Sequence, residues 1–212
     1  MAEAELTPEA ITALFTRSDG SYAFARWGRP IAPVVFGVEE DTLKVIKGAL
    51  EAVVTLAGHE MTETDPELGA NLMVFFCRDW SELVDVPNLD RLVPDLEPLV
   101  ARLEKAEANQ YRIFRFDADG GIKASFVFLR MDKHLQAVSA DVLALSQMVQ
   151  TIVLWSDLAF RDRAPLAVVE GHTILRPDIA GLIRGAYDPV LPVMASDPAH
   201  ALRLFARLQK PQ

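Results

Sequence analysis

The side chains best suited to acid–base or metal chemistry are the four histidines, His59, His134, His172 and His200. Two histidines can bind one metal from a helix face when they are about four residues apart, because that spacing is close to one turn. No two of these histidines are so spaced. His59 and Glu60 begin an H-E-x-x-H pattern, but the second histidine is missing and Gly58 ends the preceding helix. We therefore expect no bound metal and no other cofactor.

A second group of reactive side chains lies toward the C-terminus. Glu170 and His172 come shortly before a helical segment that begins near Asp178, and Asp157 precedes them. Carboxylates and an imidazole can exchange protons with a substrate if the fold brings them together. One hypothesis is therefore a hydrolase that uses these four residues.

A row of polar residues interrupts the apolar segment 140–155, which we predict to be a long helix capped by Ser139. Gln147 and Gln150 are three residues apart and should face a common side. Apolar residues of this segment should form its buried face: Leu145, Met148, Val149 and Ile152. This polar row, which includes Gln147 and Gln150, is either a patch whose side chains are satisfied by neighbouring hydrogen bonds or the wall of a cleft that binds a peptide or small molecule without cutting it.

This helix resembles the active-site helix of zincin proteases, in which H-E-x-x-H binds zinc and activates water. In that alignment Ser146 and Gln150 take the ligand positions, Gln147 the base position and Ser156 the third ligand position. Serine and glutamine are poor zinc ligands, and an amide cannot take a proton from water. The segment 175–187 resembles the matrixin-like segment that packs under the active-site helix. The matching residues are Leu175, Pro177, Asp178, Gly181, Ile183 and Tyr187.

The chain as a whole resembles the bacterial domain of unknown function 2927, a zincin-like family with a helix of the type E-E-x-x-Q-x-L-G-L-x-N-D. Gln150, Leu154 and Asp157 match that helix, whereas Ser146, Gln147, Val153 and Ser156 depart from it. The resemblance implies a degenerate active site, composed of Ser146, Gln147, Gln150, Ser156, Asp157, Asp178 and Tyr187. It also implies a non-catalytic domain with a binding or structural role, whose partner is a peptide, a protein or a cell-envelope component.

Composition excludes several other functions. The formal net charge of −9 disfavours binding to nucleic acid and to anionic membranes, since both need a basic face. No apolar run approaches the roughly 18 residues of a membrane span. The lone Cys77 ends an apolar run and is expected to be buried. The N-terminus has no signal-peptide pattern, so we expect a cytoplasmic protein unless the chain is the trimmed form of an exported one.

Hydrophobic periodicity predicts an α+β fold. Helices are expected at residues 7–17, 41–57, 99–108, 140–155, 177–185 and from 198 onward, and strands at 22–27, 31–38, 71–77, 111–116 and 122–129. We expect one domain, residues 1–212, with a sheet-forming part (1–138) and a helical part (139–212). The resemblance predicts a zincin-like mixed β-sheet packed on the long helix. It also places the hairpin 111–129 beside strand 71–77, and Tyr187 near the degenerate site.

Overall fold

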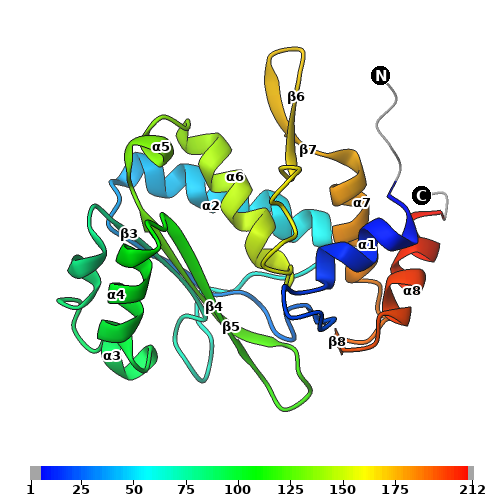
Figure 1. Ribbon diagram of the computed structural model, residues 1–212, viewed down its shortest axis with the longest axis horizontal. Coiled ribbons are helices and arrows are strands. Elements are labelled where there is room, and N and C mark those ends of the chain that lie inside the picture. Colours follow the sequence, from blue (N-terminus) through cyan, green and yellow to red (C-terminus); the bar gives the residue numbers. More distant parts are fainter. Residues whose placement is uncertain (1–5, 210–212) are drawn as a thin grey trace.

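The computed structural model describes residues 6–209, and its central feature is a four-stranded mixed sheet covered by helices (Figure 1). The strands of the sheet are β2 (Pro33–Phe36), β3 (Leu72–Cys77), β4 (Gln110–Phe116) and β5 (Ile122–Arg130). The larger helices are α1 (Pro8–Phe15), α2 (Glu40–Ala57), α4 (Leu96–Lys105), α6 (Ala140–Ile152), α7 (Pro177–Ala186) and α8 (Ala199–Leu208). Short helical turns complete the described part: η1 (Trp80–Leu83), α3 (Leu89–Leu92) and α5 (Lys133–Gln136).

The strand order in the sheet is β2-β3-β5-β4. β3 pairs in parallel with β2 and with β5, whereas β4 pairs antiparallel with β5 through the turn at residues 117–121. In that turn the Asp117 carboxylate accepts bonds from the backbone of Asp119 and Gly121. The prediction that the hairpin joins strand 71–77 in one sheet is therefore confirmed. β4 is left as an edge strand.

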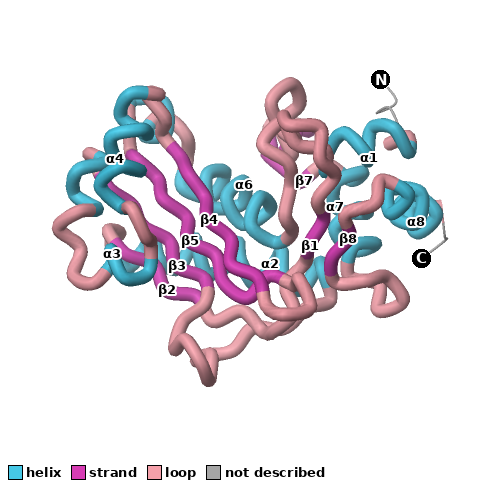
Figure 2. The backbone as a smooth tube through the Cα atoms, turned by 60° about the horizontal axis from the view of Figure 1, so that its bottom comes forward, coloured by secondary structure: helices cyan, strands magenta, loops and turns pink. Residues whose placement is uncertain are grey.

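Residues of β3 and β5 alternate between two hydrophobic cores, one on each face of the sheet. Leu72 and Val127 contact the core that contains α2 and α6, whereas Phe75 and Phe128 contact the core that contains α3 and α4. Figure 2 shows the four strands side by side with α2 and α6 behind them. A strand that is buried on both faces must be apolar at nearly every position, which explains the composition of β5.

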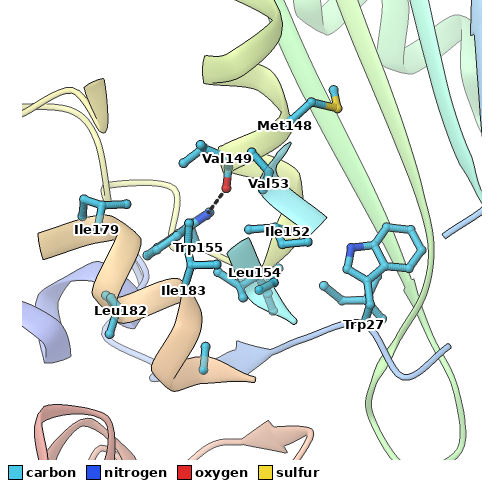
Figure 3. Packing of buried hydrophobic residues seen from close by; sticks show 14 of the residues in the cluster. Trp27, Val53, Met148, Val149, Ile152, Leu154, Trp155, Ile179, Leu182 and Ile183 are labelled. Atoms are coloured by element: carbon cyan, nitrogen blue, oxygen red, sulfur yellow. Dashed lines mark hydrogen bonds between the residues drawn. The ribbon is translucent and has the colours of Figure 1, made fainter. Parts of the chain in front are cut away.

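The larger core extends from the N-terminal to the C-terminal part of the described chain, from Leu6 to Leu204. The N-terminal segment joins the C-terminal part through a small sheet, in which β1 (Phe24–Ala25) pairs antiparallel with β8 (Met194–Ala195). Packing within the core is dense around Trp27, Ile152 and Ile183 (Figure 3). Cys77 is buried as predicted, and burial raises the pKa of its thiol to about 11.

The part of the chain after residue 139 is less purely helical than predicted. It contains β8 and an antiparallel hairpin of β6 (Leu166–Val169) and β7 (His172–Leu175), which projects from the body of the molecule (Figure 1). The hairpin turn places Glu170 and Gly171 at φ values of 51° and 83°. Two successive positive φ values are typical of the tight turns that suit strand twist.

No helix within residues 6–209 combines the length and the apolar character needed to cross a membrane. The longest of the described helices, α2, has 18 residues but begins with Glu40 and Asp41 and continues with Lys44. The negative charges at its start stabilise the helix through a favourable interaction with the helix dipole.

Candidate functional site: a cleft along the free edge of β4

The helix α6, which carries the predicted degenerate site, ends earlier than expected. The prediction extended it to about residue 155, but it ends at Ile152. Val153 forms a bridge with Arg26, and the Leu154 amide donates to the Ala25 carbonyl at 2.8 Å. The backbone thus leaves the helix for an extended pairing with the N-terminal segment. Ser156 and Asp157 consequently lie beyond the helix.

Ser156 and Asp157 are held by the end of α1 and by the turn that follows it. The Ser156 amide donates to the Leu14 carbonyl at 2.9 Å, and the Asp157 carboxylate accepts from the Ser18 amide at 3.0 Å. Hydrogen bonds from the Ser18 side chain and backbone lower the pKa of Asp157. The carboxylate therefore helps to close the loop between α6 and the hairpin β6–β7.

The polar row on α6 faces β4. Gln147 is 3% exposed, and its amide oxygen accepts from the guanidinium of Arg112 while its amide nitrogen donates to Gln110 at 3.3 Å. Gln150 donates to the Ser146 hydroxyl at 3.1 Å and lines a cleft together with Gln110 and Arg112. The common orientation of Gln147 and Gln150 toward β4 agrees with the prediction from their spacing.

The remaining predicted site residues occupy separate environments. Asp178 lies in the first turn of α7, where its carboxylate forms an ion pair with Arg163 at 2.7 Å. Glu170 and His172 are exposed at the end of the β6–β7 hairpin. Among residues 6–209 no group of three histidine, cysteine or acidic side chains is arranged to hold a metal ion.

Tyr187 packs against the C-terminal end of α6 and is only 9% exposed. Its hydroxyl donates to the Ile152 carbonyl at 2.7 Å and accepts from the Trp27 amide at 3.3 Å. Burial raises the pKa of this phenol. The contact agrees with the predicted return of segment 175–187 to this helix, but Tyr187 does not line the cleft that Gln150 lines. The hydroxyl satisfies two backbone groups at the point where the helix ends.

We expect Tyr187→Phe to lower the free energy of unfolding by about 1–3 kcal/mol, because it leaves a buried carbonyl and a buried amide without their partner. Tyr111→Phe is the matched control, since the Tyr111 hydroxyl bonds only the exposed Arg102. Urea unfolding of both variants measures the difference. Equal losses would show that the Tyr187 hydroxyl does not stabilise the end of α6.

The principal cavity beside the polar row is a cleft of about 920 Å³. Its walls come from β4, from the C-terminal end of α6 with residues 154–161, and from residues 17–19 after α1. Residues 110–114 of β4 all line it, although successive side chains of a strand point to opposite faces. The cleft therefore wraps around the free edge of the sheet. Two large apolar side chains stand exposed in it, Phe116 at 44% and Leu158 at 39%.

The backbone of β4 presents unused hydrogen-bonding groups to this cleft. In β5 the Ser125 amide donates to the β3 side of the sheet and the Arg130 amide donates to Asn109, on the β4 side. Backbone direction alternates along a strand, so Phe126 and its partner Ile113 form a hydrogen-bonded pair. Arg112 and Phe114 consequently direct their amide and carbonyl groups away from β5. Within residues 6–209 no other backbone group forms a hydrogen bond with these amides and carbonyls.

The charges around the cleft are mostly positive. Arg17, Arg112 and Arg161 line it, against the acidic residues Asp19 and Asp157. Both acids already accept hydrogen bonds, Asp157 from Ser18 and Asp19 from Ser21, whose hydroxyl lowers the pKa of Asp19. Desolvation lowers the pKa of Arg112 to about 10. The lining thus carries one more positive than negative side chain, on a protein whose formal net charge is −9.

Comparison of the chain with protein-family models, with curated proteins and with solved structures gives no match. The geometry of the cleft and its charges are therefore the basis for a functional assignment.

Proposed function

We propose that the chain is a non-catalytic, zincin-like domain that binds an extended peptide along the free edge of β4. The observation that carries the proposal is the pair of outward-facing backbone positions, Arg112 and Phe114, inside a cleft of about 920 Å³. An extended peptide can add a strand to such an edge, using main-chain hydrogen bonds for affinity and side-chain pockets for specificity. A free edge is also a hazard for aggregation, which a regular partner would cover.

The zincin-like part of the proposal is supported by the arrangement of the elements. The helix α6 lies beside the edge strand, and the segment that contains α7 returns so that Tyr187 bonds the end of α6. The non-catalytic part is supported by the side chains at the polar row. Gln147 has its amide engaged by Arg112 and Gln110, and neither a serine nor a glutamine supplies a base or a strong metal ligand.

The alternative, a hydrolase built on Asp157, Glu170, His172 and Asp178, receives no comparable support. Asp157 closes a loop with Ser18, and Asp178 pairs with Arg163. His172 is exposed on the projecting hairpin. A proton relay needs its groups within hydrogen-bond reach of one substrate.

The proposed function predicts that peptides selected from a random display library will bind the wild-type protein and lose affinity when the β4 edge is blocked. Phe114→Pro removes an amide that faces the cleft, without removing a hydrogen bond to β5. We expect it to weaken the selected peptides at least about tenfold more than Phe114→Ala, since one main-chain bond and the strand alignment are lost. Calorimetric titration measures both affinities, and circular dichroism checks that both variants fold.

Phe114→Ala is the matched control, because both variants remove the aromatic ring and only proline removes the amide. Equal affinities of the two variants for the selected peptides would contradict strand addition at β4. A library from which the wild-type protein selects no peptide would contradict the proposed function as a whole.

A further inference from the structure

The guanidinium of Arg112 has no carboxylate partner among the described residues. Its Nη2 donates to the side-chain oxygens of Gln147 and of Gln110, the latter at 3.3 Å, and both acceptors are neutral amides. Its Nε is buried without an acceptor. Within residues 6–209 no carboxylate forms an ion pair with it. A guanidinium has five N–H donors; because Nη2 is engaged and Nε is buried, those of Nη1 are left for a ligand.

Keeping such a cation partly desolvated costs stability, because a charge removed from water needs a counter-charge. Two other partly buried arginines of the described structure have one: Arg29 pairs with Asp65 and Glu67, and Arg207 pairs with Asp188. Arg112 instead has two glutamines that hold its plane beside the cleft. A planar, fixed guanidinium is the group that binds carboxylates with two parallel hydrogen bonds.

We propose that the ligand of the β4 cleft carries a carboxylate group that pairs with Arg112, an inference that rests on the proposed function. The rest of the cleft fits this ligand. Arg161 adds positive charge at its walls, whereas Arg17 lies near Asp19 and Asp157, whose carboxylates are also bonded to Ser21 and Ser18. Phe116 and Leu158 offer apolar contacts to the neighbouring residues of an extended chain. The ligand is accordingly an acidic peptide with apolar flanks.

The carboxylate can be a side chain or a free C-terminus, and three pentapeptide probes distinguish these sources. The first is acetyl-Thr-Val-Glu-Val-Thr-amide, and the second has glutamine in place of glutamate. The third has the same glutamine and a free C-terminal carboxylate. Valine and threonine favour the extended conformation in all three. Calorimetric titration against the wild-type protein should show one of the two charged probes binding about tenfold more tightly than the neutral probe.

Variants of Arg112 then locate the effect. Arg112→Gln should bind the charged and neutral probes with equal affinity, and Arg112→Lys should keep only part of the preference, because an ammonium lacks the planar fork. Arg115→Gln is the matched control: it removes the same charge from the same strand at an exposed position that does not line the cleft, and the preference should remain. The chemical shift of the Arg112 side-chain N–H, measured in the wild-type protein, should move with the charged probe only.

Equal binding of charged and neutral probes to the wild-type protein would overturn the carboxylate inference and leave peptide binding intact. A preference that survives in Arg112→Gln would overturn the assignment to Arg112. Failure of both charged probes to bind would also overturn the inference, whereas the library selection decides the proposed function independently. Should Arg112→Gln not fold, the side-chain chemical shift in the wild-type protein still decides the question.

Discussion

Replacing Ile152 by alanine is expected to lower the free energy of unfolding by about 2–5 kcal/mol, the range for truncating a buried aliphatic side chain. Ile152 is 1% exposed in the core that also contains Trp27 and Val53 (Figure 3). It is the last residue of α6, and its carbonyl accepts the Tyr187 hydroxyl. A cavity at this point would loosen the end of the helix and its bond to Tyr187. Urea unfolding measures the loss.

Leu145→Ala is the matched control on the same helix. The sequence pattern placed Leu145 on the buried face of α6 with Met148, Val149 and Ile152, but Leu145 is only half-buried. Its truncation should therefore cost clearly less than that of Ile152, because less apolar surface returns to water. A loss below about 1 kcal/mol for Ile152→Ala would mean that the surroundings collapse into the cavity and that α6 is peripheral to stability.

The central sheet was predictable because its signals are local. Three elements have a sequence pattern that can be recognised within the segment itself: the apolar run of β3, the hairpin turn at Asp117 and the amphipathic helix α2. Burial of β5 on both faces follows because α2 and α6 cover one face of the sheet and α3 and α4 cover the other. The β6–β7 hairpin also has a local signal, two β-branched runs around Glu170 and Gly171, but from the sequence Glu170 and His172 are assigned to a possible hydrolase site and no hairpin is predicted there.

The end of α6 and the site beside it depend on contacts between distant segments. Val153 leaves the helix because it pairs with Arg26, which lies more than one hundred residues earlier in the chain. The hydrophobic periodicity of the helix does not predict that pairing. Arg112 likewise looks like an ordinary polar residue of an edge strand. Its role as an unpaired cation can be recognised only in the folded protein, where α6 places Gln147 against it and no carboxylate of the described residues pairs with it. The polar row on α6 was therefore predicted, whereas its partner was not.

Gly37→Ala is expected to destabilise the fold by about 2–6 kcal/mol, through backbone strain together with a steric clash. Gly37 follows β2 at a φ of +81°, and a Cβ atom there would lie 2.1 Å from the carbonyl oxygen of Phe76. Gly58→Ala is the matched control, because Gly58 at the end of α2 has a φ of +64° but open space around its Cα. Its loss should be limited to the strain of a left-handed conformation, about 1–2 kcal/mol. Denaturant unfolding of both variants separates strain from clash. Equal losses would mean that the chain after β2 can move away from β3, and that the close approach of these strands adds nothing to the specification of the sheet.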